Sequence, residues 1–96
     1  MSKYILSPAA QKSLQQIRSY SLSNFGKQQT TLYLKKLRDR MQYLADQPAR
    51  GTTRDDIKAG YYSHFEGAHT IYYRIRDTHI DIIDVLHQSM EPTRHL

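Results

Sequence analysis

Apolar and polar residues alternate most clearly near the C-terminal end of the chain, in two runs joined by a short polar segment. Apolar side chains occupy every second position of the segment 69–75 (HTIYYRI), which is the period of a β-strand. The segment 79–87 (HIDIIDVLH) is richer in β-branched residues, and Ile82-Ile83 breaks its alternation, which predicts a strand covered on both faces. The polar residues 76–79 are the place to reverse direction. We therefore expect an antiparallel hairpin over residues 68–87, covered by the rest of the chain.

The N-terminal half of the chain shows helical periodicity instead. A short strand is expected over residues 3–6, after which Ser7 offers an N-cap with Pro8 at the first helical position. Apolar residues then recur at helical spacing to about Asn24, and Gly26 supplies a C-terminal stop. The pattern predicts a first helix that ends before this glycine.

A second helix is predicted over residues 27–46, with Pro48 ending it. The glycine break before it is too short for anything except an antiparallel helix hairpin. The stripe that should face the sheet consists of Thr30, Leu34, Leu37, Met41 and Leu44, flanked by Tyr33. Leu32 and Tyr43 share a face away from this stripe, where they are either ordinary surface residues or a docking patch.

The segments that follow the helices are short. Residues 47–56 (QPARGTTRDD) are polar and turn-rich, which predicts a loop. A strand is expected over residues 58–65, with Glu66-Gly67 as the turn into the hairpin described first. The tail, residues 88–96, contains Pro92, which bars a long helix.

Length and pattern together fit a single α+β domain over residues 1–96. The expected order is β-α-α-β-β-β: an N-terminal strand, an antiparallel helix hairpin packed on one face of the sheet, and a three-stranded antiparallel meander. The pattern does not say which edge of the sheet the first strand takes. There is no cysteine and no apolar run long enough to span a membrane, so we expect a soluble, cytoplasmic protein.

The formal net charge of +5 is unevenly distributed. Residues 1–57 contain ten Lys/Arg and four Asp, giving 10 − 4 = +6, whereas residues 58–96 contain four Lys/Arg and five Asp/Glu, giving 4 − 5 = −1. A basic field of this kind attracts phosphates or an acidic protein partner equally well, and it also occurs on ordinary solvated helix faces.

Catalytic and cofactor motifs are absent from the sequence. It has no phosphate-binding loop, dinucleotide fingerprint, G-x-S-x-G or H-E-x-x-H motif, and no motif of sequence-specific nucleic-acid binding. Among its five histidines, His64 and His69 flank a turn and could face each other, but two ligands do not make a metal site. We therefore expect no metal and no cofactor.

A ribonuclease would need cations for the scissile phosphate and a group that titrates near neutral pH. Candidates of these types near the C-terminal end are Arg74, His87, Arg94 and His95. Tyr72 falls on the same side of its strand as Arg74. The alternative is that Arg74 pairs with a sheet carboxylate, Asp81 or Asp84, as arginines on sheet faces commonly do.

With these elements placed, the chain resembles the ParE-type toxins of the RelE/ParE toxin superfamily. The resemblance rests on the order and spacing of short motifs along nearly the whole chain. These are Tyr4-x-Leu6-Ser7-x-Ala9, Gly26-x-x-Gln29, Tyr33-x-x-x-Leu37, Leu44-Ala45-x-x-Pro48-x-x-Gly51, Gly60, His69-x-Ile71-Tyr72-Tyr73-Arg74 and Val85-Leu86-His87-x-x-Met90-x-x-x-Arg94-His95-Leu96.

The resemblance implies the toxin of a type II toxin–antitoxin module, neutralised by a cognate antitoxin that is short, acidic and partly disordered, with the option of a higher-order toxin–antitoxin assembly. ParE-like toxins are associated with DNA gyrase, whereas RelE-like relatives cleave messenger RNA on the ribosome. The chain lacks the dense basic set and C-terminal tyrosine of the nucleases, which favours gyrase, although His87 sits where some of those nucleases use a histidine.

The two readings place function on different residues. Under the gyrase reading, the residues expected to bind the target are Met90, Arg94, His95 and Leu96, and those expected to bind the antitoxin are Leu32 and Tyr43. A ribonuclease would instead depend on Arg74 and His87. A third alternative is an inactive toxin that only binds its partner.

Overall fold

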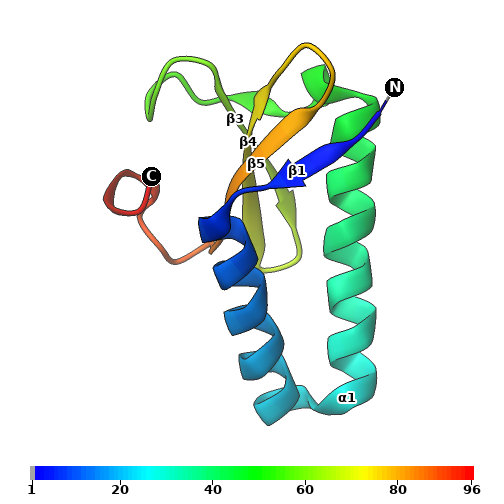
Figure 1. Ribbon diagram of the computed structural model, residues 1–96. Helices are drawn as coiled ribbons and strands as arrows, with labels where there is room; N and C mark the ends of the chain where they lie inside the picture. The colour runs from blue at the N-terminus through cyan, green and yellow to red at the C-terminus, as the bar shows by residue number, and fades with distance from the viewer. Residues whose placement is uncertain (1) are drawn as a thin grey trace.

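In the computed structural model, which describes residues 2–96, a helical hairpin lies against one face of a five-stranded sheet (Figure 1). The elements in chain order are β1 (Tyr4–Leu6), α1 (Pro8–Asp46), the 3₁₀ turn η1 (Pro48–Arg50), β2 (Thr52–Thr53), β3 (Tyr61–Glu66), β4 (His69–Ile75), β5 (Ile80–His87) and the 3₁₀ turn η2 (Pro92–Arg94). The α+β class is as expected, but the element count is different. No helix within the described residues is long and apolar enough to cross a membrane.

The helical region bears the single label α1, and Gly26 divides it into the two helices that the sequence predicted. Its N-terminus is capped as expected, because the Ser7 hydroxyl accepts a hydrogen bond from the Ala10 N–H at 3.0 Å. Only Gly26 leaves helical geometry inside it, with φ 84° and ψ 174°, a backbone region that is essentially restricted to glycine. The glycine therefore folds α1 back on itself, and we call residues 8–25 the first arm and residues 27–46 the second arm (Figure 1).

The sheet has the order β1-β5-β4-β3-β2, in which β1 runs parallel to β5 and every other pair is antiparallel. The first strand therefore takes the edge next to β5. The additional strand, β2, lies inside the segment predicted as a loop, since two residues are too few to show an alternating pattern. Strand β3 begins at Tyr61 rather than at residue 58, and its turn to β4 contains Gly67 and Ala68, one position later than expected.

A β-bulge explains the broken alternation in β5. Tyr72 lies opposite Asp84 and Tyr73 lies opposite Ile82, so Ile83 is the extra residue. The bulge lets both Ile82 and Val85 face the core, while the adjacent residue Leu86 is buried on the other side. The prediction of a strand covered on both faces is confirmed, and the bulge is its local cause.

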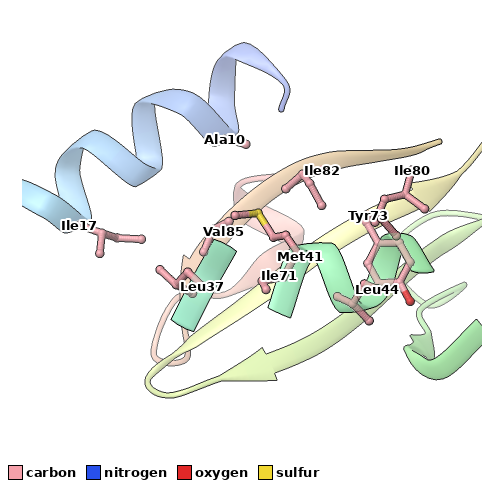
Figure 2. Packing of buried hydrophobic residues seen from close by; sticks show 11 residues of the cluster. Ala10, Ile17, Leu37, Met41, Leu44, Ile71, Tyr73, Ile80, Ile82 and Val85 are labelled. Atoms are coloured by element: carbon pink, nitrogen blue, oxygen red, sulfur yellow. The ribbon is translucent and has the colours of Figure 1, made fainter. Parts of the chain in front are cut away.

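The core is formed where both arms meet β4 and β5 (Figure 2). Its side chains are Ala10 and Ile17 from the first arm, Leu37, Met41, Leu44 and Ala45 from the second arm, and Ile71, Tyr73, Ile80, Ile82 and Val85 from the two strands. Thr30, predicted in the apolar stripe, is buried too, and its hydroxyl contacts the Ser21 hydroxyl at 2.8 Å and the Gly26 carbonyl at 2.8 Å. The Tyr73 hydroxyl leaves the core and donates to the Pro48 carbonyl at 2.6 Å.

Candidate functional site

Two arginines lie over tyrosine rings on the sheet face that points away from the second arm. Tyr61 lies opposite Arg74 in the register, and these residues alternate with side chains that face the core. The Arg74 guanidinium carbon is 5.9 Å from the Tyr61 ring centroid, and that of Arg54 is 5.8 Å from the Tyr72 centroid. We call these four residues the arginine–tyrosine face. Stacking of this kind holds a guanidinium over a ring and leaves its edge available to an acceptor.

The two arginines of this face differ in their partners. Arg54 contacts Asp56 through two nitrogens, at 3.1 Å each, and this pairing raises the pKa of Arg54 and lowers that of Asp56. Sequence reasoning missed Arg54, because it precedes β3 in a segment with no periodic pattern that would place it over Tyr72.

The expected pairing of Arg74 with a sheet carboxylate is wrong. Asp81 lies opposite Arg74 but pairs with Arg76 at 2.7 Å, an interaction that lowers the pKa of Asp81. Asp84 instead accepts a hydrogen bond from the Ser13 hydroxyl at 2.5 Å. Within residues 2–96, Arg74 therefore has no carboxylate partner, and its charge faces outward from the sheet.

The structure does not bring Arg74 and His87 together. His87 is opposite His69 in the register, five positions from Arg74 along β4, and five strand residues span about 16 Å. The ring centroids of His87 and His69 are 5.4 Å apart, and His69 contacts Tyr33 of the second arm. His87 therefore lies on the helix side of the sheet, whereas Arg74 lies on the other side.

The histidine pair of the hairpin is different from the expected one. His64 lies opposite Ile71 and its ring packs near Tyr43, with centroids 6.2 Å apart. His69 has His87 as its cross-strand neighbour instead. No group of three or more His, Asp or Glu side chains in residues 2–96 is arranged to hold a metal ion.

His69 is held by a phenol and shielded from water. The Tyr33 hydroxyl lies 2.6 Å from His69 Nδ1, donates to the Glu66 carbonyl at 3.0 Å and accepts from the Ala68 N–H at 3.2 Å. Burial lowers the pKa of His69, and the neighbouring His87 lowers it further. Burial also raises the pKa of Tyr33. Residue spacing does not indicate this contact, because it depends on how the second arm lies against the β3–β4 turn.

A groove of about 210 Å³ opens between the two arms next to β1. Its lining is apolar apart from Gln15 and two arginines: Tyr4, Leu6, Leu14, Gln15, Arg18, Leu34, Arg38 and Met41. Since its only charged lining residues are basic, we call it the basic groove. An amphipathic segment with apolar anchors and acidic flanks matches this combination.

Comparison with known proteins identifies the family of this chain. Residues 4–92 match the family model described as the ParE toxin of the type II toxin–antitoxin system, parDE. The chain belongs to the ParE toxin family. The resemblance drawn from the sequence motifs is confirmed.

Relatives of this ParE-family chain match along their whole length. Toxin ParE1 of Mycobacterium tuberculosis strain CDC 1551 / Oshkosh is 38% identical over 96 residues, covering 99% of this chain and 98% of the relative. Toxin ParE1 of Caulobacter vibrioides is 34% identical over 96 residues, covering 100% and 99%.

Two solved structures share the fold. A chain of the chromosomal ParDE toxin–antitoxin system from P. aeruginosa aligns with a TM-score of 0.76 at 13% identity, covering 91% of this chain and 96% of that one. A chain of the toxin–antitoxin complex RelBE2 from Mycobacterium tuberculosis aligns with a TM-score of 0.58 at 20% identity, covering 91% and 98%.

The ParE-family tail is a short appendage with little attachment to the sheet. Its backbone is joined to the β3–β4 turn by the Gln88 N–H, which donates to the Ala68 carbonyl at 2.8 Å. Beyond this point its backbone bonds are local, such as the Leu96 N–H to the Pro92 carbonyl at 2.9 Å. The expected target-binding residues Met90, Arg94 and His95 are exposed, and Leu96 is partly buried.

Leu32 and Tyr43 do not form one patch. Leu32 is 55% exposed. Tyr43 is partly buried against the core, with the Arg40 guanidinium 5.0 Å from its ring centroid. Eleven helical residues separate the two by about 16 Å along the second arm. Leu32 remains available to a partner, whereas Tyr43 offers only an edge beside Arg40.

Proposed function

We propose that this chain is the toxin of a type II toxin–antitoxin module, acting in the cytoplasm by binding and inhibiting DNA gyrase. The observation that carries the proposal is membership of the ParE family over residues 4–92, together with 38% identity to a Toxin ParE1 along the whole chain. The opposing placement of Arg74 and His87 supports a mechanism based on binding rather than on bond cleavage.

The surface that we assign to gyrase combines the arginine–tyrosine face and the tail. Figure 1 shows the tail projecting from the side of the sheet away from the second arm. Arg74 lies on the sheet face away from the second arm because it alternates with the core residues Ile71 and Tyr73 along β4. Arg74 and the exposed Arg94 offer cations, and Met90, 37% exposed, offers an apolar contact. Aromatic, arginine and methionine side chains are the types enriched at protein interfaces.

The antitoxin that we propose is an acidic segment, partly disordered when unbound, that folds over the helical hairpin. Arg18 and Arg38 at the basic groove supply the complementary charge, and the apolar floor supplies the area to bury. Leu32 extends this surface along the second arm. The two solved structures described above come from toxin–antitoxin systems, which supports a partner of this kind.

Purified gyrase tests the target. In a supercoiling assay, the wild-type chain should inhibit the enzyme or trap cleaved DNA, and Arg94→Glu or a chain truncated after Ser89 should do so less. Lys27→Glu, which makes the same charge change at an exposed position beside the hairpin bend, is the matched control and should act as wild type. Normal supercoiling at a large molar excess of wild-type chain would rule out gyrase as the target.

The antitoxin surface is tested by association kinetics. Arg18→Glu and Arg38→Glu should slow association with the cognate antitoxin, and increasing salt should slow the wild-type chain toward the same rate. Lys58→Glu, an exposed charge reversal in the β2–β3 connection, serves as the control. An association rate that does not respond to salt would exclude the basic groove as the approach surface.

The second candidate function is a ribosome-dependent messenger-RNA endoribonuclease. It is favoured by one observation, the two guanidinium groups of Arg54 and Arg74 held over the buried rings of Tyr72 and Tyr61 on one sheet face, an arrangement that suits a phosphodiester. Sequencing of 5′ ends during growth arrest separates the two candidates. New ends within translated messages would establish the nuclease, and intact messages would exclude it.

A further inference from the structure

His69 and His87 form a cross-strand pair at the end of the β4–β5 ladder. They are direct register partners, and their ring centroids are 5.4 Å apart with the ring planes at 90°. His69 is half-buried, whereas His87 is exposed to solvent. One imidazole is therefore fixed by its surroundings and the other is accessible from outside.

The distance between the rings suits one metal ion bound by both imidazoles. Two imidazoles bound to one ion through nitrogen, with bonds of about 2.0 Å and a tetrahedral angle, place their centroids roughly 5 Å apart. The observed 5.4 Å lies within a small side-chain rotation of that value. Direct cross-strand neighbours have backbones already spaced for this arrangement.

The Nδ1 atom of each ring lies within hydrogen-bond distance of a hydroxyl group. The Tyr33 hydroxyl donates its hydrogen bond to the Glu66 carbonyl, so its oxygen can accept one from His69 Nδ1–H at 2.6 Å. In this tautomer of His69, Nε2 carries the free lone pair. His87 Nδ1 lies 2.7 Å from the Ser89 hydroxyl, which accepts the ring proton in the tautomer whose Nε2 is unprotonated. Partners of this kind fix the orientation of metal-binding histidines.

Solvent reaches the exposed ring of His87, so an ion held between the two imidazoles can complete its shell with water. The neighbouring carboxylate, Glu66, is held by Arg40 at 3.2 Å. Two imidazoles do not make a closed structural metal site, so the ion would be an exchangeable one with solvent completing its shell. Such a site binds Cu²⁺ more tightly than Zn²⁺, and Mn²⁺ or Mg²⁺ least.

We propose that His69 and His87 bind one divalent transition-metal ion, Cu²⁺ in preference to Zn²⁺, through their Nε2 atoms. The ion would join the start of β4 to the end of β5, where the tail begins. Without the ion, the Ser89 N–H donates a hydrogen bond to His87 Nδ1 at 3.1 Å. Metal binding through Nε2 places a proton on Nδ1, so this backbone hydrogen bond must break. The site does not depend on the proposed target or antitoxin.

Calorimetry of the full chain with Cu²⁺, Zn²⁺ and Mn²⁺ tests the proposal. One Cu²⁺ per chain is expected, with affinity falling in that order. His87→Ala should abolish the measured binding, and Tyr33→Phe, which leaves the ligand but not its positioning hydroxyl, should weaken it by about 10-fold. The matched controls His64→Ala and His95→Ala should bind as wild type. Equal Cu²⁺ affinity in His87→Ala would overturn the site.

A measurement on the wild-type chain avoids the effect of substitutions on folding. In ¹⁵N spectra of the histidine rings, Zn²⁺ should shift the Nε2 signals of His69 and His87 and the backbone amide of Ser89, and leave His79, which contacts Asp81 at 2.9 Å, unchanged. Shifts confined to the other three histidines, or no shifts with saturating Zn²⁺, would overturn the proposal.

Discussion

Arg74 and His87 lie on opposite faces of the sheet and five register positions apart along β4. A cation that holds a scissile phosphate and a group that moves its proton must both reach one bond, within about 3 Å of their target atoms. Neither side-chain rotation nor a small backbone shift brings two residues through a packed sheet. The pair therefore does not form one active centre, which agrees with the proposed mechanism based on binding.

Replacing His87 separates binding from catalysis. We predict that His87→Ala retains growth arrest when expressed without antitoxin, because its ring faces the helix side and is 5.4 Å from His69 rather than near Arg74. The chain truncated after Ser89 should lose arrest. Circular dichroism and antitoxin capture establish that both variants fold. Loss of arrest in a folded, antitoxin-binding His87→Ala variant would contradict the binding mechanism.

The bend in α1 depends on the backbone of Gly26. We predict that Gly26→Ala lowers the free energy of unfolding by about 1–3 kcal/mol, since φ 84° and ψ 174° are strained for any residue with a Cβ. A Cβ there would meet no atom within 4 Å, so the cost is conformational rather than steric. Gly26→Asn should not restore stability, because asparagine tolerates the left-handed helical region and not this one. Urea unfolding measures both, with Lys27→Ala expected within about 0.5 kcal/mol of wild type.

Gly51 presents the converse case, in which space rather than backbone geometry requires glycine. A Cβ at Gly51 would lie 2.8 Å from Cζ of Tyr73 and closer still to its hydroxyl, whereas its φ of −73° suits any residue. We predict that Gly51→Ala costs about 1–3 kcal/mol of unfolding free energy. In a Tyr73→Phe background the cost should be smaller, because the nearest atom is gone. Additive losses in this double-mutant cycle would show that the two residues do not interact.

The parts of the fold that could be predicted from the sequence are those that repeat over many residues. The strand periods of residues 69–87, the stripe from Thr30 to Leu44 and the Ser7 cap all appear in the structure. The break at Gly26 also appears where it was predicted, whereas the two-residue strand β2 could not be predicted, because it depends on two residues in a tertiary setting.

The candidate site was less predictable, since its contacts cross between elements. Residue spacing placed Arg74 on the polar side of its strand but could not show that Asp81 forms its salt bridge with Arg76 instead. Nor could it show Arg54 over Tyr72, or His69 opposite His87 instead of His64. Such pairings follow from register and loop path, which a local pattern does not encode.

Unfolding at alkaline pH reports on the buried hydroxyl group of Tyr73. Burial raises the pKa of Tyr73 to about 12, against about 10 for an unfolded tyrosine. Between these values the unfolded chain releases the proton first, so the stabilisation is fully present below pH of about 10 and is lost as pH rises toward about 12. We predict that the free energy of unfolding of the wild-type chain falls over this window more steeply than that of Tyr73→Phe. Parallel curves for the wild type and Tyr73→Phe would mean that the Tyr73 hydroxyl titrates as freely in the folded chain as in water, and that its 2.6 Å bond to the Pro48 carbonyl does not hold the proton in place.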